Sequence, residues 1–326
     1  MDTQLAQTET GSMSKTAPIK GPATKDTATT DTAGGIGLRS IATGVFAQSL
    51  VGGSVAVSRE LTSAPLFTAQ AIRYIAASAI LVALAKTTRV PLVRPRGREW
   101  LYLIGIAALG LVLFNIAVVR GVAHAEPAVI AVAVACVPVV LGVVGPLIEH
   151  RSPQGRVVVA AVVVTAGSAL VEGAGRADAV GIGWAAVALV CEAAFTLLAV
   201  PVLPRHGAWG VALHSVWIGA AMLAVLGVST EGVDAAGRLT AADWAAMAYL
   251  AVMVTAVAFI LWYSTVAALG AGAVGLLTGM APVSAACVGI ATGGKVPGLA
   301  VWCGVVVVVA GLAIGLVRSE RADSRM

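Results

Sequence analysis

The feature that most constrains this chain is a series of apolar runs about as long as a lipid bilayer is thick. A helix needs about 20 apolar residues to cross the roughly 30 Å of hydrocarbon in a membrane. Ten such segments follow one another, joined by short connections that often contain Pro or Gly. They are residues 41–58, 65–85, 100–119, 127–148, 155–173, 181–201, 208–228, 244–266, 271–291 and 298–317. The pattern predicts an all-α polytopic membrane protein with ten transmembrane helices.

The composition does not suit a water-soluble fold. Hydrophobic residues make up 59% of the chain and charged residues only 11%, whereas soluble domains carry about 25% charged residues. The four cysteines lie within apolar runs and form no C-x-x-C pair, so we expect packing residues rather than disulfides. The net charge of +5 is spread over short loops, which does not favour nucleic-acid binding.

Motifs for catalysis and nucleotide binding are missing from the sequence. The stretch GIATGGKV, residues 289–296, is close to a phosphate-binding loop but has Val296 where that motif requires Ser or Thr. There is also no H-E-x-x-H, no G-x-S-x-G and no His/Cys spacing typical of a metal site. We therefore expect no metal and no cofactor.

The charges of the loops predict the orientation in the membrane. If the N-terminus is inside, fifteen Lys and Arg residues fall on the inner side and five on the outer side, with Arg73 inside a helix. Because Lys and Arg are retained in the cytoplasm, we expect a cytoplasmic-membrane protein with both termini cytoplasmic. Residues 1–37 lack periodicity and an apolar signal-peptide core, so they and residues 319–326 are expected to be cytoplasmic tails, the first disordered.

An internal repeat is visible at an offset of 144 residues. The landmarks that recur are Glu99-Trp100 with Asp243-Trp244, Pro138 with Pro282, Pro153 with Pro297, and Ala166-Gly167 with Ala310-Gly311. The period contains five helices, so the second copy enters the membrane from the opposite side. Residues 38–178 and 179–318 are therefore predicted to be two inverted five-helix repeats. Such repeats allow alternating access around a site near the midplane, which favours a carrier.

Two stretches resemble the EamA-type family of the drug/metabolite transporter superfamily. They are APLFTAQAIRYIAASAILVALA, with Arg73, and VPVVLGVVGPLIEHRSPQGRVVVAAVVVTAGSALV. Pro138, Glu149 and Gly167 fit the family pattern, although Ile148 stands at a usual glycine position. The second copy departs from it, with TGGK where the family usually repeats the acid. The resemblance covers about residues 38–318 and implies export or exchange of small metabolites, often amino acids or related polar compounds, without ATP hydrolysis.

Glu192 is the most unusual residue of the sixth predicted helix, in ALVCEAAFTLLAVP. It lies near mid-depth if that helix covers residues 181–201. Hydrocarbon disfavours a charged carboxyl group, so Glu192 is a candidate site for a proton or a substrate. The alternative is a protonated acid that makes an interhelical hydrogen bond or faces water without a function. The first repeat has no acid at the corresponding position, so proton coupling would be asymmetric.

Further polar residues within the predicted helices are candidates for a binding cavity. Arg73 either holds an anionic substrate group or ties helix ends together. By depth alone His214 comes close to Glu192, which suggests a Glu–His relay, but a single histidine in a membrane helix also serves in packing. Weaker candidates are Asn115, Gln48, Trp262, Tyr263 and Ser264. The small-residue motifs GLLTG (275–279) and GLAIG (311–315) suit packing within the fold as well as a homodimer.

These features predict a secondary active transporter that exports or exchanges a small polar metabolite, amino-acid-like or drug-like, by alternating access. Its partners would be the substrate, the lipid bilayer and protons as the coupling ion. Two alternatives remain from the residues alone. One is a membrane-embedded enzyme that uses buried Glu, His and Arg in acid–base chemistry, and the other is a non-transporting scaffold or channel subunit. The lack of a catalytic spacing and the inverted repeat weigh against the enzyme.

Overall fold

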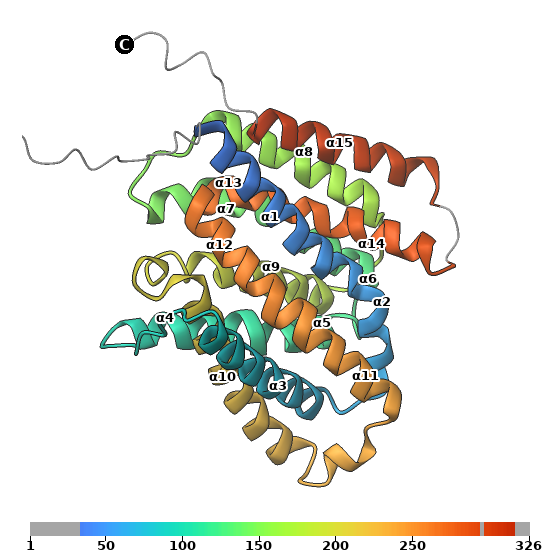
Figure 1. Cartoon of the computed structure of the whole chain (residues 1–326). Coiled ribbons are helices and arrows are strands. Elements are labelled where there is room, and N and C mark those ends of the chain that lie inside the picture. The colour runs from blue at the N-terminus through green and yellow to red at the C-terminus, as the bar shows by residue number, and fades with distance from the viewer. Residues whose placement is uncertain (1–32, 294–296, 317–326) are drawn as a thin grey trace, which may run out of the picture.

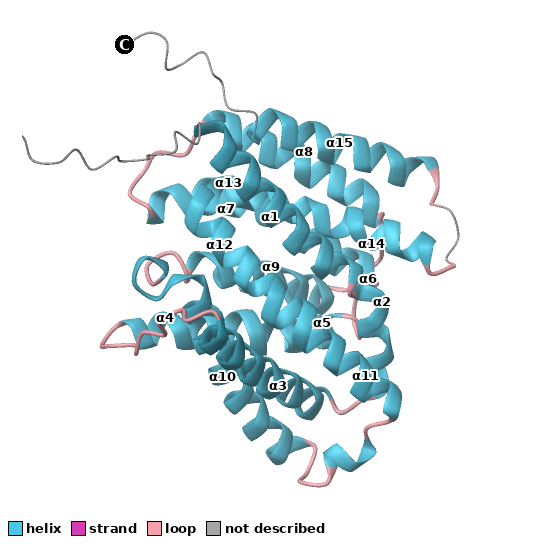
Figure 2. Cartoon of the chain, in the orientation of Figure 1, coloured by secondary structure: helices cyan, strands magenta, loops and turns pink. Residues whose placement is uncertain are grey.

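A computed structural model describes residues 33–293 and 297–316. The predicted tails 1–37 and 319–326 lie outside these residues, except that Ala33–Gly37 already form the first turn of a helix. Within the described residues the chain consists of helices and loops without a strand, as Figure 2 shows.

Ten helices within residues 33–293 and 297–316 are long and apolar enough to cross a membrane, as predicted. We number them as spans. Span 1 is α1 (Ala33–Gly53) with α2 (Val55–Ser58), span 2 is α3 (Leu66–Thr87), span 3 is α4 (Glu99–Gly105), η2 (Ile106–Leu113) and α5 (Phe114–Gly121), span 4 is α6 (Pro127–Val134) and α7 (Val137–Ile148), and span 5 is α8 (Gly155–Glu172). Span 6 is α9 (Ala179–Leu197), span 7 is α10 (Leu203–Thr230), span 8 is α11 (Ala241–Tyr249), η4 (Leu250–Ala258) and α12 (Phe259–Leu269), span 9 is α13 (Ala271–Gly275), η5 (Leu276–Gly279) and α14 (Met280–Ala291), and span 10 is α15 (Leu299–Leu316). Short 3-10 turns, η1 (Arg59–Ser63) and η3 (Ala235–Arg238), occupy two loops.

Span 1 begins at Ala33 rather than at residue 41, and the boundary between spans 6 and 7 also differs from the predicted one. Span 6 stops at Leu197 rather than at residue 201, and span 7 begins at Leu203. Pro201 explains the early stop, because a proline lacks the backbone N–H and disfavours helical geometry in the residue before it. Pro204 sits in the first turn of span 7, where the missing N–H costs nothing.

The start of α1 and the end of α15 lie at the same end of the helix bundle, on the left of Figure 1. We call this end the termini face; it carries loops 88–98, 149–154 and 198–202. The opposite face carries loops 59–65, 122–126, 173–178 and 231–240. Both ends of the described chain are therefore on one side, as an even number of crossings requires.

The two halves of the chain share the same irregularities in their helices. Span 3 contains a π-helical segment at 106–113, and span 8 contains one at 250–258, which is 144 residues later. Span 4 is interrupted just before Pro138 and span 9 just before Pro282. Prolines remove a backbone donor from the helix, which accounts for both breaks.

The packing of the helices is also the same when each helix is exchanged for its counterpart five spans away. Spans 2 and 7 pack against each other, and so do spans 5 and 10. Span 1 packs on spans 8 and 9, while span 6 packs on spans 3 and 4. The middle of the bundle is thus a junction at which both halves contribute equivalent helices.

Spans 5 and 10 approach each other closely through glycines. A Cβ atom on Gly167 would lie 2.9 Å from the carbonyl oxygen of Gly304, and one on Gly304 would lie 2.6 Å from that of Gly167. The predicted small-residue motifs are used inside the chain as well: Gly275 faces Leu141, and Gly311 faces the backbone of span 5. These glycines let helices of one chain approach, so they are not available to a partner copy.

Candidate functional site

A cavity of about 160 Å³ lies where spans 1, 2, 3, 6 and 8 meet. We call it the central cavity. Its lining consists of Ala47, Gln48, Val51, Arg73, Tyr74, Gly110, Leu111, Phe114, Asn115, Glu192, Phe195, Val254, Ala258, Phe259 and Trp262. The fold therefore brings together five of the residues singled out in the sequence, namely Gln48, Arg73, Asn115, Glu192 and Trp262.

Most of the lining comes in pairs related by the repeat offset. Ten of the fifteen residues form five pairs exactly 144 positions apart, and these pairs are 48/192, 51/195, 110/254, 114/258 and 115/259. Because paired positions lie at equivalent places in the two halves, the central cavity sits on the pseudo-symmetry axis between them. Arg73 and Tyr74 are exceptions, since their counterparts Trp217 and Ile218 do not line it.

Glu192 and Gln48 are one of these pairs. Within the part of the chain that the structure describes, no hydrogen bond or ion pair reaches either side chain. Glu192 is nevertheless deep in the bundle, and its carboxyl group faces the central cavity. A buried acid without a polar partner is unfavourable unless it is neutral or is paired by a ligand. The wall thus offers one unsatisfied carboxyl group and one unsatisfied amide.

Arg73 is held by neutral groups rather than by an acid. Its Nε donates to Thr255 Oγ1 at 2.9 Å, and one terminal nitrogen donates to Gln70 Oε1 at 3.2 Å. Its guanidinium carbon lies 5.3 Å from the centre of the Tyr74 ring. No carboxylate among the described residues lies within ion-pair distance. Since a guanidinium has five N–H donors, some remain for an anionic group in the cavity.

The predicted role of Arg73 as a tie between helix ends is not what the contacts show, because Thr255 is in the middle of span 8. Thr255 belongs to the π-helical segment, whose wider turn is common at functional sites. Asn115, in contrast, donates to the carbonyl oxygen of Leu111 one turn earlier in span 3. Its side chain therefore already has a partner for one donor.

Aromatic rings that the sequence did not single out form much of the remaining wall. They are Tyr74, Phe114, Phe195 and Phe259. The centres of Phe195 and Phe259 are 4.9 Å apart, a distance typical of favourable ring contacts. The indole N–H of Trp262 donates to Thr196 Oγ1 at 3.0 Å, which fixes its ring. The cavity thus combines charged groups with an apolar aromatic surface.

Comparison with known proteins identifies the family. The sequence model of the EamA-like transporter family matches residues 38–172 and again residues 179–317. The chain belongs to this family. EamA proteins are part of the drug/metabolite transporter superfamily, so the protein is a membrane transporter.

Two individual proteins resemble the chain over much of its length. YetK, an uncharacterized transporter of Bacillus subtilis (strain 168), is 24% identical over 247 residues, which are 73% of this chain and 75% of YetK. A protein of known crystal structure superposes with a TM-score of 0.72 at 18% identity, covering 85% of this chain and 97% of its own. At that identity the second similarity concerns the fold alone.

The EamA-type acid Glu149 has a structural role at the termini face. It follows span 4 and accepts a hydrogen bond from the backbone N–H of Ala271, the first residue of span 9, at 2.8 Å. Glu231, which the sequence reasoning missed, does the same at the opposite face. Its carboxylate accepts from the backbone N–H groups of Phe67 and Thr68 at 2.9 and 2.8 Å. Carboxylates stabilise helix N-termini, and here each comes from the other half.

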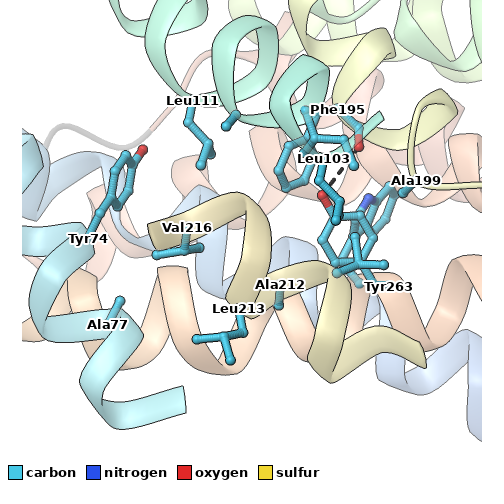
Figure 3. Packing of buried hydrophobic residues seen from close by; sticks show 14 of the residues in the cluster. Tyr74, Ala77, Leu103, Leu111, Phe195, Ala199, Ala212, Leu213, Val216 and Tyr263 are labelled. Atoms are coloured by element: carbon cyan, nitrogen blue, oxygen red, sulfur yellow. Dashed lines mark hydrogen bonds between the residues drawn. The ribbon is translucent and has the colours of Figure 1, made fainter. Parts of the chain in front are cut away.

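Three of the predicted site residues, Tyr263, Ser264 and His214, do not line the central cavity. Tyr263 is fully buried beside it, and its hydroxyl donates to the carbonyl oxygen of Phe195 at 3.3 Å, as the dashed line in Figure 3 shows. Ser264 is also absent from the lining. Trp262 and Tyr263 are neighbours in sequence. Because successive residues of a helix point about 100° apart, the side chain of Trp262 lines the cavity and that of Tyr263 does not.

His214 lies in a different cluster, near the termini face. Its Nε2 is 3.0 Å from the carbonyl oxygen of Val93, and the indole N–H of Trp217 donates to its Nδ1 at 3.1 Å. Because a carbonyl only accepts, the proton of His214 is assigned to Nε2. Span 7 packs mainly on spans 2, 3 and 8 rather than on span 6. The predicted proximity of His214 to Glu192 assumed that consecutive helices are neighbours, which is not the case here.

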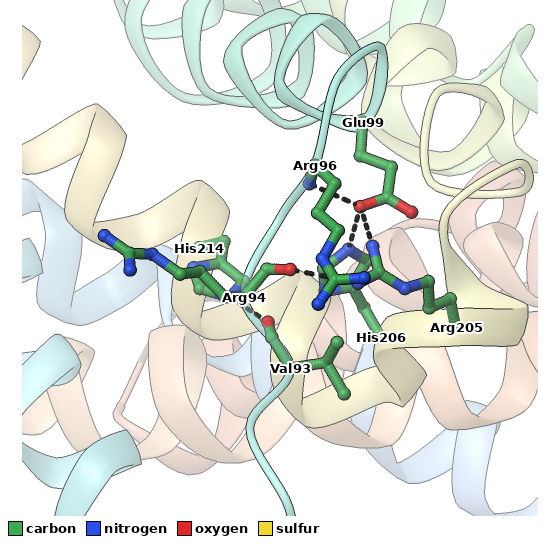
Figure 4. A network of polar contacts seen from close by, with 7 residues as sticks. All are labelled: Val93, Arg94, Arg96, Glu99, Arg205, His206 and His214. Atoms are coloured by element: carbon green, nitrogen blue, oxygen red, sulfur yellow. Dashed lines mark hydrogen bonds and ion pairs between the residues drawn. The ribbon is translucent and has the colours of Figure 1, made fainter.

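The same cluster joins two loops of the termini face. Figure 4 shows Arg205, His206 and the backbone of Arg96 converging on one carboxylate, that of Glu99. His206 Nε2 is 3.1 Å from Glu99 Oε2, and the His206 ring packs edge-on against His214 with centres 5.5 Å apart. The cluster therefore fastens the start of span 7 to the loop between spans 2 and 3.

Proposed function

We propose that this transporter is a secondary active carrier of the cytoplasmic membrane that exports or exchanges a small polar metabolite, amino-acid-like or drug-like. Transport would proceed by alternating access and be coupled to protons through Glu192. The observation that carries the proposal is the carboxyl group of Glu192, which faces a cavity on the axis between the two halves and has no polar partner among the described residues.

The size and chemistry of the central cavity support a small substrate. A cavity of about 150 Å³ holds a molecule of the size of benzene, and the central cavity measures about 160 Å³. Glu192 suits a cationic group, Arg73 suits an anionic group, and the aromatic rings suit an apolar body.

Proton coupling follows from the two states of one carboxyl group. A deprotonated Glu192 is stabilised by a cationic group of the substrate, whereas an empty, desolvated site favours the neutral acid. Proton and substrate therefore compete for the same group. If the central cavity opens to the two faces in turn, a proton moving one way drives the substrate the other way.

The two repeats, residues 38–178 and 179–318, would exchange shapes in this cycle, with the termini face in the cytoplasm. The equivalent helix packing of the two halves supports such an exchange. The surplus of basic residues in the loops of the termini face supports the orientation.

Purified protein in liposomes tests the proposal. Radiolabelled amino acids and a panel of small cationic and zwitterionic drugs are offered with and without an imposed pH gradient. We expect a solute whose uptake the gradient accelerates and whose acceleration Glu192→Gln abolishes. A matched control is Glu126→Gln, which removes a carboxylate from an exposed ion pair with Arg176 on the opposite face.

The same assay separates the alternatives. Conversion of the solute to a new compound would indicate an enzyme, and neither conversion nor uptake would indicate a scaffold. A gradient response that survives in Glu192→Gln at wild-type strength would remove the proton-site proposal while leaving the carrier intact.

A further inference from the structure

A second hollow lies nearer the termini face than the central cavity does. Span 8 lines both spaces. The second hollow measures about 440 Å³ and is lined by Glu149, Arg151, Val200, Leu203, Pro204 and Val266–Gly270. We call it the termini-face hollow. Along span 8, Val254 to Trp262 line the central cavity and Val266 to Leu269 line the termini-face hollow. The two spaces therefore follow each other along one helix.

Only about one helical turn separates them. Trp262 and Val266 are four residues apart, which corresponds to about 6 Å along a helix. Tyr263 lies between them in the sequence. Its side chain is fully buried, whereas Trp262 lines the central cavity and Val266 lines the termini-face hollow. The order is the same at the end of span 6: Phe195, within the helix, lines the central cavity, and Val200, in the loop that follows, lines the termini-face hollow.

The separating layer consists of packed aromatic rings. The rings of Phe195 and Tyr263 lie 5.2 Å apart, and the Tyr263 hydroxyl is hydrogen-bonded to the Phe195 backbone. Leu103 and Ala199 fill the space beside them and are fully buried, as Figure 3 shows. Rings that are packed together and hydrogen-bonded across two helices obstruct the way between the two spaces.

The positions that correspond to Phe195 and Tyr263 in the other half of the chain do not form such a layer of rings. Position 51 corresponds to Phe195 and position 119 to Tyr263, and both are valines. Val51 and Val119 are 36% and 46% exposed, compared with 7% and 0% for Phe195 and Tyr263. Neither valine carries a ring, so the ring contact at the termini end of the central cavity has no counterpart at the corresponding positions of the other half.

We propose that Phe195 and Tyr263 are the barrier between the central cavity and the termini face, and that this barrier parts when substrate passes. Tyr263 accordingly acts by closing the path rather than by binding substrate. The structure represents the state that is closed toward the termini. This inference rests on the central cavity being the substrate site.

Thiol labelling tests the barrier without requiring a known substrate. Ala258→Cys places a thiol on the wall of the central cavity, in a chain whose four cysteines have been replaced by alanine. A charged, membrane-impermeant thiol reagent is applied to the termini side of sealed vesicles. We expect slow labelling with Tyr263 in place and labelling at least about tenfold faster in Tyr263→Ala or Phe195→Ala, as expected for a barrier lowered by about 1.4 kcal/mol.

Two controls make the result specific. Val266→Cys, in the termini-face hollow, is expected to label at the same rate with and without Tyr263, which also reports that the variants are folded. Tyr263→Phe keeps the ring and loses the hydroxyl, so it should remain nearly as slow as the parent. If Tyr263→Ala fails to fold, Tyr263→Leu and Phe195→Leu, which keep more of the packing volume, take its place.

Equal labelling of Ala258→Cys in the parent and in the folded variants of both positions would overturn the barrier. The test is independent of the proposed proton coupling, because labelling is measured without transport. If the wild-type protein shows no proton coupling in the liposome assay but the barrier variants label faster here, the barrier stands and only the role of Glu192 is removed.

Discussion

Glu192 in the second half and Gln48 in the first occupy corresponding places on the wall of one cavity, and neither has a polar partner among the described residues. The backbone around them is equivalent down to the π-helical segments of spans 3 and 8. The charges are not equivalent: only one half supplies a carboxyl group, and the guanidinium of Arg73 comes from the other.

This difference separates two requirements of a carrier. Exchange between two shapes needs backbones that can adopt each other's conformation, and both halves meet that need. Binding a substrate in one orientation and moving a defined number of protons needs distinct side chains at the two sides of the site. In the proposed cycle the helices would meet the first requirement and a few cavity residues the second.

The largest effect is expected from making the two halves alike. Glu192→Gln places the same amide on both sides of the cavity, so no group remains there to exchange protons. We expect gradient-driven uptake to fall to about a tenth of the wild-type rate or less, a change of about 1.4 kcal/mol or more. The measurement is uptake into liposomes at a fixed pH gradient.

A second variant moves the carboxyl group from position 192, in the second half of the chain, to position 48, in the first. The double variant Gln48→Glu with Glu192→Gln restores one carboxyl group, now in the first half. We expect part of the gradient response to return, because the two positions are equivalent in the backbone. No recovery would mean that the surroundings of span 6, and not the cavity as such, make Glu192 functional.

Arg73 is the second asymmetric charge. Arg73→Gln removes it, and we expect substrates with an anionic group to bind about 10 to 100 times more weakly, as for the loss of a charged hydrogen bond of about 1.5 to 3 kcal/mol. Solutes without an anionic group should change little. Thr255→Val, which removes only the acceptor that positions Arg73, should have a smaller effect of the same kind. Equilibrium binding of matched solutes to the purified variants measures this.

The reciprocal helix caps allow a comparison of stability. Glu231→Gln weakens the contacts with two backbone N–H groups and the hydroxyl of Thr68, and a charged hydrogen bond contributes about 1.5 to 3 kcal/mol. Glu149→Gln weakens one such contact. Thermal unfolding in detergent should therefore show a larger drop for Glu231→Gln. An equal or reversed order would contradict the capping role.

The smallest effect concerns the start of the second half. Asp178 accepts from the backbone N–H of Gly181 at 2.8 Å, and this bond, together with His124, holds the pKa of the Asp178 carboxyl below its usual value. A lowered pKa in the folded state means that the stabilisation is present above about pH 4, the ordinary aspartate value, and is lost as the pH falls through the lowered one. Asp178→Asn should lower the melting temperature slightly near neutral pH and not at pH 2 to 3. A difference that persists at low pH would contradict this.

Much of this architecture could be predicted from the sequence, because hydrocarbon imposes length and apolarity on every crossing segment. Ten spans, the repeat offset and the polar positions Gln48, Arg73 and Glu192 all stand out against an apolar background. What a linear pattern does not contain is the direction of each side chain about its helix and the choice of neighbouring helices. These two gaps account for the errors.

Three residues show the limit. His214 was expected near Glu192 because spans 6 and 7 are consecutive, yet span 7 packs on span 2. Tyr263 was expected on the cavity wall as a polar aromatic residue of a predicted helix, yet it is buried beside the cavity. Phe195 was not singled out at all, since a phenylalanine in an apolar run has no polar signature. The offset of 144 residues relates it to Val51, which lines the same cavity, but neither residue has a polar signal in the sequence.

The glycine contacts between spans 5 and 10 have a consequence for following this protein at work. With backbone oxygens less than 3 Å from the place of a missing Cβ, these two helices pack backbone against backbone, and we expect them to move as one unit. A pair of spin labels on their lipid-facing sides should therefore report one constant distance through the whole transport cycle. That pair provides an internal ruler, against which the displacement of every other helix can be measured.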